Sequence, residues 1–362
     1  MTYCSGGVPA AVQCIDGGRD AAATLEKCNN TRLKHYSTFG IALLLVGMTV
    51  CTHARWAVGQ EDGNLLGPLV NKDAFQNYQS GFDRDVLALQ ILLDRQNISC
   101  NCIDGVWGTR TEIALLTWQM MNDLPTTGIP TAEILEVLSR DAPDVLTRYT
   151  VTEKDHADLG PFPEAWEARA RLPAMSYTTI LEMVAERGHA TERLIQRLNP
   201  EVAWPNPRAG TEVVLPNPTP AARVKAGSIR ISLARTEVTV FNADGKLVAL
   251  FPCSIARDKA KRPVGDLTVR TTALNPDYTY DPQLFFPGGA NTSKLKIPPG
   301  PNNPVGTAWI SLSLQGYGIH GTPYPEQIGR AESKGCFRLS NWNAVKLLRM
   351  VSVGTPIEIE ED

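Results

Sequence analysis

Residues 318–339 read GIHGTPYPEQIGRAESKGCFRL, and this stretch decides how the C-terminal part of the chain is interpreted. It opens with a short apolar strand that ends in a histidine followed by glycine, and near its end a cysteine follows another glycine. Cys336 follows His320 by sixteen residues, and His320 is the last histidine of the chain. The thiolate is the reactive form of cysteine, and a neighbouring imidazole can generate it. We therefore expect His320 and Cys336 to meet at one site.

The residues around this stretch predict a mostly antiparallel β domain, similar to a β-sandwich and carrying short helices, over residues 226–362. Residues 237–241 and 247–253 flank the turn Asn242-Ala243-Asp244-Gly245, which is typical of a hairpin. Further strands are predicted at 228–233, 267–271, 308–314 and 356–360. A helix is predicted over 341–351, and no period indicates a parallel βαβ sheet.

Residues 71–140 have the period of a small helical bundle. The apolar residues of two predicted helices are Val86, Leu89, Leu92 and Leu93 in the first, and Ile113, Leu116 and Met120 in the second. The sequence DGVWG at 104–108 predicts the turn between them, with Thr109 capping the second helix. Trp107 and Trp118 are expected to pack inside this unit rather than bind sugar.

Residues 174–217 predict a second small unit of two short helices followed by a strand. Asn199-Pro200 ends the second helix, and residues 210–216 form the strand. The polar, proline-containing residues 141–173 between the two units are predicted to be an ordered linker with a short helix near 164–170.

Residues 1–54 are predicted to be an N-terminal extension and a signal peptide. The apolar run at 39–51 has 13 residues, whereas a membrane span needs about 20. Arg32 and Lys34 precede it and Ala54 closes a small-x-Ala site, so cleavage after Ala54 is predicted. A buried helix or an uncleaved anchor is the alternative, and the true start is expected near Leu33. Export follows, with no membrane span after cleavage; the compartment, the periplasm or cell envelope of a bacterium, is implied only by the resemblances given below.

Composition excludes few partners but sets the number of domains. A chain of 362 residues is expected to form two or three domains. The net charge is −3 without a basic stripe, so no nucleic-acid partner is predicted.

The cysteines beyond the signal predict no disulfide framework. Cys100 and Cys102 are separated by one residue, which is a strained spacing for a bridge, and Cys253 lies in an apolar strand and is expected in the core. Cys336 is then expected to be a free thiol. A structural zinc ion needs four ligands and the last domain offers only Cys253, Cys336 and His320, so neither a metal nor a cofactor is predicted.

Two regions resemble modules that bind the bacterial cell wall. Residues 89–128 (LQILLDRQNISCNCIDGVWGTRTEIALLTWQMMNDLPTTG) are similar to the three-helix peptidoglycan-binding domain, whose pattern runs LQ, then DG-x-x-G-x-x-T, then A-x-x-x-x-Q and G. Residues 180–200 (ILEMVAERGHATERLIQRLNP) with 209–216 (AGTEVVLP) resemble a LysM carbohydrate-binding module whose usual first strand is blurred.

The stretch quoted first resembles the signature of the L,D-transpeptidase family with the YkuD-like catalytic domain, written HG, then S-x-G-C-x-R. The resemblance covers residues 226–361 and includes the turn Arg262-Pro263-Val264-Gly265. The family often has histidine where Lys334 stands, which puts a supporting role of that position in doubt.

This resemblance implies a cysteine acyltransferase acting on peptidoglycan. Cys336 attacks the stem tetrapeptide, D-Ala leaves with a proton returned by His320, and an amine takes the acyl group from the thioester. The amine belongs to another stem, giving a 3→3 crosslink, or to a lysine of a wall-anchored lipoprotein; if water takes it, the enzyme is an L,D-carboxypeptidase. The partners are then stem peptides and glycan.

The supporting residues have roles to match. Gly321 is expected to orient His320 through its carbonyl, and the backbone at Gly335 to face the oxyanion. Arg338 is expected to hold a substrate carboxylate, with a structural ion pair as the alternative. Ser333 either binds substrate or braces the loop.

Two other functions compete with this one. A packed thiol at Cys336 and a structurally satisfied His320 would make the chain a non-catalytic peptidoglycan-binding protein. A papain-like protease would have its cysteine first and its histidine far downstream, whereas here histidine precedes cysteine.

Overall fold

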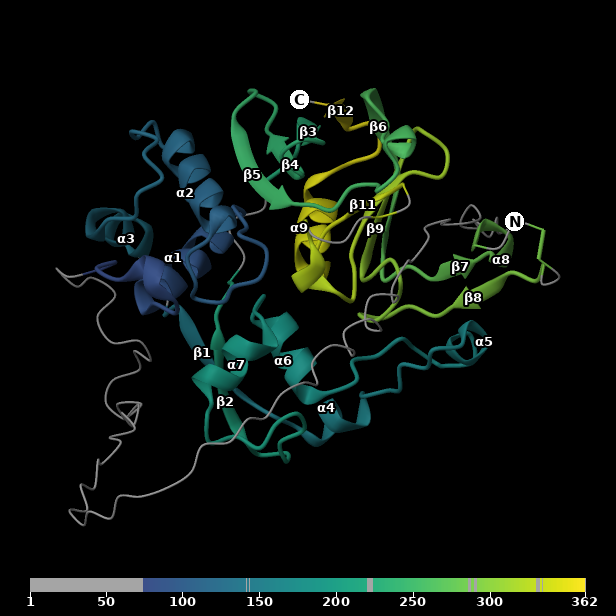
Figure 1. Ribbon diagram of the computed structural model, residues 1–362, viewed down its shortest axis with the longest axis horizontal. Helices are drawn as coiled ribbons and strands as arrows, with labels where there is room; N and C mark the ends of the chain where they lie inside the picture. The colour runs from purple at the N-terminus through teal and green to yellow at the C-terminus, as the bar shows by residue number, and fades with distance from the viewer. Residues whose placement is uncertain are drawn as a thin grey trace, which may run out of the picture.

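The computed structural model describes residues 74–140, 142, 144–219, 224–285, 288–289, 292–329, 333 and 335–361. The predicted extension and signal at 1–54 lie outside these residues, and so does Lys334. None of the helices within the described ranges is long and apolar enough to cross a membrane. The described residues form three units that follow one another along the chain and pack together (Figure 1).

The first unit is the predicted helical bundle. It contains η1 (Tyr78–Ser80), α1 (Arg84–Arg95), α2 (Thr109–Met121) and α3 (Ala132–Ser139). Asp83 begins α1 by accepting two backbone N–H groups of the first turn. Gln90 of α1 holds the turn before α2, because its Oε1 accepts the N–H groups of Asp104 and Gly105 at 3.0 and 2.8 Å. Gln90 is the Q of the LQ position and Asp104-Gly105 is the DG position of the sequence pattern, so this contact explains why the pattern contains both.

The buried face of α2 differs from the predicted one. Met120 is 55 % exposed, whereas Leu115 and Trp118 are buried. α2 carries apolar residues on most of its circumference, so their spacing could not select the face that packs. Gly108, not Thr109, is the N-cap, and it makes no side-chain cap hydrogen bond.

The second unit pairs two strands and packs helices on them. Its elements are β1 (Leu146–Thr150), α4 (Glu153–Ala157), α5 (Trp166–Arg169), α6 (Ile180–Arg187), α7 (Glu192–Leu198) and β2 (Glu212–Pro216). β1 runs antiparallel to β2, with Tyr149 opposite Val213. β1 lies inside the range predicted as a linker, so this unit begins earlier in the chain than predicted, while α5 falls within the predicted short helix.

The third unit is built on one eight-stranded sheet with the order β11-β10-β9-β6-β12-β3-β4-β5. Its strands are β3 (Ser228–Ser232), β4 (Glu237–Phe241), β5 (Leu247–Pro252), β6 (Gly265–Leu274), β9 (Ala308–Leu312), β10 (Gly318–His320), β11 (Phe337–Arg338) and β12 (Pro356–Glu360). The pairs β10–β11 and β12–β3 are parallel, and the other neighbours are antiparallel. The sheet is therefore mostly antiparallel, as predicted.

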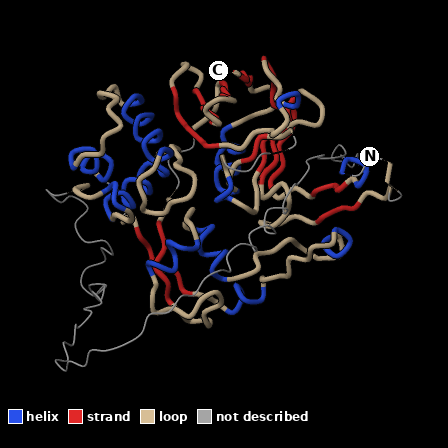
Figure 2. Tube along the Cα trace, viewed as in Figure 1, coloured by secondary structure: helices blue, strands red, loops and turns tan. Residues whose placement is uncertain are grey.

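The sheet curls around its own core instead of forming the two separate sheets of a sandwich (Figure 2). Val240 and Phe251 from one end of the strand order share a core with Ile310 and Ile319 from the other end. Leu347 of α9 (Asn341–Met350) is buried in the same core. Burying both ends of the sheet in one core holds the edge strand β11 and its neighbour β10 in place.

A side hairpin joins the second and third units. It consists of β7 (Tyr278–Tyr280), α8 (Pro282–Phe285) and β8 (Leu295–Ile297), and the 3-10 helices η2 (Lys259–Lys261) and η3 (Pro325–Gln327) lie in other loops. Trp166 of α5 stacks on Tyr280 with ring centroids 4.2 Å apart, and the N–H of Met175 donates to the carbonyl of Pro299 at 2.9 Å. Figure 1 shows α5 beside this hairpin.

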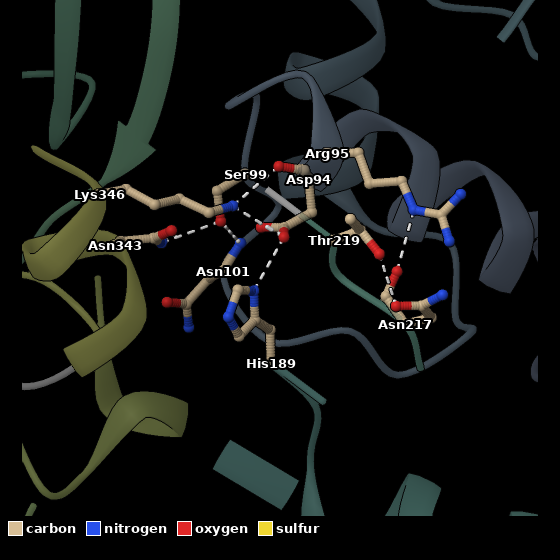
Figure 3. Close-up of polar contacts among 9 residues, drawn as sticks. All are labelled: Asp94, Arg95, Ser99, Asn101, His189, Asn217, Thr219, Asn343 and Lys346. Atoms are coloured by element: carbon tan, nitrogen blue, oxygen red, sulfur yellow. Dashed lines mark hydrogen bonds and ion pairs between the residues drawn. The ribbon is translucent and has the colours of Figure 1, made fainter. Parts of the chain in front are cut away.

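All three units meet at a buried polar junction (Figure 3). Asp94 of α1 lies 2.8 Å from Lys346 of α9 and 2.8 Å from His189 of the second unit. Asn343 of α9 donates to the Ser99 hydroxyl at 2.9 Å beside them. Because each unit supplies a residue to one network, the three units are held as one body.

Candidate active site

The register of β10 and β11 places the predicted pair on one face of the sheet. In this parallel pair Ile319 lies opposite Phe337 and His320 opposite Arg338. Side chains alternate along strands, so His320 and Cys336 share the face that Ile319 and Phe337 do not use. An offset of two residues between adjacent strands corresponds to roughly 8 Å between Cα atoms. The fold therefore brings the two predicted residues to one place.

Trp309 forms the wall that both residues share. Its indole stacks on the His320 ring with centroids 5.6 Å apart, and Cys336 belongs to the same buried cluster as Trp309. Gly318 is required here, because a Cβ at this position would collide with the Trp309 ring. The sequence analysis missed Trp309, which its place in an apolar strand did not distinguish from a core residue.

His320 is held in one tautomer. Its Nδ1 lies 2.6 Å from the carbonyl oxygen of Gly321. A carbonyl only accepts, so Nδ1 carries the proton and Nε2 has the lone pair of a base. Among the described residues, Nε2 has no hydrogen-bond partner. Gly321 thus makes the contact that was predicted for it.

The environment of His320 favours the neutral ring. The side chain is buried, and burial together with the nearby charge of Arg338 lowers its pKa to about 3. The hydrogen bond to Gly321 opposes this shift but does not overcome it. At neutral pH the imidazole is therefore uncharged and can take a proton.

Gly321 also allows a close approach that a side chain would prevent. A Cβ at position 321 would collide with Oδ1 of Asn341, and so would a Cβ at Gly306. The same oxygen accepts the backbone N–H of Thr307 at 3.1 Å. Asn341 is thus a second residue that the sequence analysis missed, because only the fold brings the start of α9 to these glycines.

Cys336 is buried, with 3 % of its surface exposed, and its Sγ lies 3.7 Å from the carbonyl oxygen of Gly316. In contrast to the predicted free thiol, Cys336 is disulfide-bonded, whereas Cys100, Cys102 and Cys253 are free. Chemistry at this sulfur needs the reduced form. Cys253 is a core residue, as predicted, and burial raises the pKa of its thiol to about 12.

Ser333 and Gly335 shape the loop in front of Cys336. The Ser333 hydroxyl donates to the carbonyl of Cys336 at 2.5 Å and accepts the Gly335 N–H at 3.2 Å. The Ser333 backbone is tied to Ile255, whose carbonyl accepts its N–H at 2.8 Å. These contacts correspond to the loop-bracing alternative for Ser333.

Arg338 lies beside the histidine. Its backbone exchanges hydrogen bonds with Ser254 at 3.0 and 2.9 Å, and only 9 % of the residue is exposed. It lies opposite His320 in the register of β10 and β11, and its charge lowers the pKa of that ring.

A cysteine and a neutral histidine on one sheet face are the groups that enzymes transferring acyl groups through a thioester require. The sequence profile described as "L,D-transpeptidase catalytic domain" matches residues 226–359, and that of a "Putative peptidoglycan binding domain" matches residues 83–138.

Several known proteins are similar to the chain. "Putative L,D-transpeptidase YkuD" of Bacillus licheniformis is 26 % identical over 179 residues, which cover 49 % of this chain and 92 % of the relative. "Putative L,D-transpeptidase YqjB" of Bacillus subtilis is 30 % identical over 133 residues, covering 35 % and 68 %. Among solved structures, an L,D-transpeptidase from Xylanimonas cellulosilytica has a TM-score of 0.32 and 15 % identity, covering 78 % of this chain and 96 % of that one.

The chain belongs to the L,D-transpeptidase family. It combines the catalytic domain of that family with a peptidoglycan-binding domain, so the polymer on which it acts is peptidoglycan.

Proposed function

We propose that reduced Cys336 is the nucleophile and His320 its base in peptidoglycan L,D-transpeptidation. As the sulfur attacks the carbonyl carbon before the terminal D-Ala of a stem tetrapeptide, the thiol proton passes to Nε2 of His320. The C–N bond then breaks, His320 returns the proton to the departing amine, and a thioester remains on Cys336. An acceptor amine attacks the thioester, loses a proton to His320 and releases the thiol. The observation that carries this proposal is the shared sheet face of a histidine with a free Nε2 lone pair and Cys336.

The neutral state of His320 fits the role of base. With a pKa lowered to about 3, the ring is unprotonated at neutral pH and its lone pair is available, but it becomes an imidazolium only when a negative charge forms beside it. Proton transfer is then coupled to attack on the substrate, instead of producing a standing ion pair with the thiolate.

The loop before Cys336 is the proposed oxyanion site. We assign this role to the backbone at Gly335, whose N–H is held by the Ser333 hydroxyl at 3.2 Å. During the reaction the Gly335 N–H would leave the Ser333 hydroxyl and donate to the developing oxyanion. The Ser333 hydroxyl would keep donating to the Cys336 carbonyl. One donor of this kind contributes roughly 3 kcal/mol in comparable sites. Arg338, near His320, is the proposed partner of a substrate carboxylate.

The first two units are proposed to bring the enzyme to its polymer. Residues 83–138 match a peptidoglycan-binding profile. In the second unit β1 pairs with β2, and α6 and α7, the last two of the four helices between these strands, support the LysM-like assignment. Holding the catalytic domain near the wall raises its effective substrate concentration. Export to the periplasm or cell envelope follows from the location of this polymer.

The acceptor distinguishes three outcomes for the acyl-enzyme. An amine of a second stem gives the 3→3 crosslink, a lysine of a wall-anchored lipoprotein gives protein attachment, and water gives L,D-carboxypeptidase activity. Incubation with a disaccharide tetrapeptide, followed by mass analysis of the products, separates crosslinking from trimming. A lysine-containing peptide added to the same mixture tests the lipoprotein alternative.

A carbapenem tests the assignment of the site, because its strained lactam acylates an activated thiol. The reduced wild-type chain should gain one covalent adduct on Cys336, visible by intact mass, and Cys336→Ala should gain none. His320→Ala should keep its fold by circular dichroism and lose the adduct within the same reaction time. A wild-type chain that stays unmodified would support the alternative of a non-catalytic peptidoglycan-binding protein.

A further inference from the structure

Helix α6 of the second unit touches the first residue of α9. The Nδ2 group of Asn341 donates to Oε1 and Oε2 of Glu186 at 3.2 and 3.0 Å, and to the carbonyl of Pro301 at 3.1 Å. Its Oδ1 accepts the N–H of Thr307 at 3.1 Å. Two acceptors on one side and a donor on the other leave only one orientation for this amide.

The other side of Asn341 leads to the catalytic histidine. Its Oδ1 lies so close to Gly321 that a Cβ there would collide with it. The carbonyl of Gly321 accepts the Nδ1 proton of His320 at 2.6 Å and thereby orients the ring. Glu186 is therefore linked to His320 through one amide side chain and one glycine peptide.

We propose that Glu186 is a positioning residue for His320, acting through Asn341 and the Gly321 backbone. The inference rests on the proposed function, because it requires His320 to be the base. It assigns the second unit a part in catalysis, beyond any binding of the wall. The catalytic domain depends on a carboxylate that its own sequence does not contain.

The surroundings of Glu186 make this contact sensitive to pH. Tyr177 donates to its Oε1 at 3.0 Å, and Glu182 lies one helical turn earlier on α6. Burial of the Glu186 carboxyl, with a smaller effect of the charge on Glu182, raises its pKa to about 7, although Asn341 and Tyr177 favour the ionised form. Above this pH both oxygens accept from Asn341. Below it one oxygen carries a proton, so the hold on Asn341 weakens.

The test compares wild type with Glu186→Gln on the full, reduced chain. The rate of Cys336 acylation by a carbapenem is measured between about pH 5.5 and 8.5, with the final adduct determined by intact mass. The two proteins should react equally at the acid end, where Glu186 is protonated, and wild type should be about tenfold faster at the alkaline end. The ratio of the two rates cancels the titration of the thiol, which both proteins share.

Three further variants separate positioning from a general loss of the interface. Glu182→Gln removes a neighbouring carboxylate that accepts from Asn302 at 2.8 Å at the same interface, and it should keep the alkaline rate. Tyr177→Phe removes a hydrogen bond that lowers the pKa of Glu186, so the rise in rate should move to higher pH. A double-mutant cycle with Asn341→Ala should be non-additive, since Glu186 acts through Asn341.

The outcomes distinguish the inference from the function on which it rests. A rate ratio that is constant with pH, or close to one throughout, overturns the role of Glu186 while Cys336 still forms its adduct. A slow Glu182→Gln variant would assign the effect to unit docking and also overturn it. A wild-type chain without any adduct instead removes the proposed function itself.

Discussion

Nζ of Lys346 lies 2.8 Å from Oδ2 of Asp94 across the junction of the first and third units, with side-chain exposures of 10 % and 1 %. His189 of the second unit lies 2.8 Å from the same oxygen. Burial would raise the pKa of Asp94, but Lys346 and His189 outweigh it and hold that pKa far below its usual range. The carboxylate is therefore charged, and its two partners come from the two other units.

Removal of Lys346 should destabilise the chain strongly. Lys346→Met leaves a buried carboxylate without its cation, a change that typically costs about 3–5 kcal/mol. Urea denaturation followed by tryptophan fluorescence measures the loss. The double variant Asp94→Leu with Lys346→Met removes both charges and should recover most of it. A single variant as stable as wild type would show that the pair does not hold the units together.

Acid should weaken this junction. Because the folded pKa of Asp94 is depressed, its stabilising contribution is complete above the usual aspartate pKa near 3.9 and is lost as the pH falls toward the folded value. Melting temperature, measured from about pH 7 down to pH 3, should therefore fall steeply only below about pH 4. In Asp94→Asn this particular acid loss should be smaller. Equal acid sensitivity in both proteins would contradict the assignment.

The contribution of Glu186 to stability should depend on pH in the opposite direction to that of Asp94. Its folded pKa is raised from 4.5 to about 7, so the folded chain binds the extra proton and wild type loses stability as pH rises through this window. Relative to wild type, Glu186→Gln should gain about 2 kcal/mol between pH 5 and pH 8, less than the whole shift, because Glu186 as a residue is only half-buried. Denaturation of both proteins at several pH values measures the difference in their free energy of unfolding. A stability gap that does not change with pH would mean that Glu186 titrates normally.

The elements predicted with the greatest accuracy are those with an unambiguous local signal. β4 (Glu237–Phe241) and β12 (Pro356–Glu360) begin and end where alternation and turn residues placed them. β7 and β8 were missed because three-residue strands carry no measurable period. β1 was missed because its polar sequence resembled a linker, and its identity as a strand depends on pairing with β2.

The sequence predicted the residues of the proposed chemistry better than the residues that hold them in position. His320, Gly321 and Cys336 were predicted from local spacing. The register of β10 and β11 puts His320 and Cys336 on one sheet face, and His320 contacts the Gly321 carbonyl. The contact between Asn341 and Glu186 joins residues 155 positions apart, and no local pattern encodes it. The disulfide state of Cys336 was likewise not evident from spacing.

The protonation of His320 can be observed directly. In a 15N-histidine-labelled Cys336→Ala chain, the ring should remain neutral from about pH 8 to pH 5 with its proton on Nδ1, because its pKa is lowered to about 3. Arg338→Met should raise this pKa, since the Arg338 charge is one of its causes. A titration midpoint near 6.5 in the Cys336→Ala chain that keeps Arg338 would show that the ring is solvated.

Two glycines of the signature should respond differently to alanine. Gly321→Ala forces a methyl group onto Oδ1 of Asn341, so it should displace the carbonyl that orients His320 and lower the acylation rate by about a hundredfold. At Gly335 a Cβ would meet only the Tyr317 ring at 3.7 Å, an ordinary contact, and the backbone N–H would remain. Gly335→Ala should therefore react within about threefold of wild type.

Carbapenem acylation rates of the two reduced variants, with thermal melts to confirm folding, measure this contrast. The comparison tests a different requirement at each glycine. Position 321 has no space for a side chain, whereas position 335 has space and contributes through the direction of its N–H. If Gly335→Ala were the slower of the two, the loop before Cys336 would need the flexibility of glycine. If Gly321→Ala reacted normally, the His320 ring would not depend on the Gly321 carbonyl, and the path from Glu186 to the base would be broken at that step.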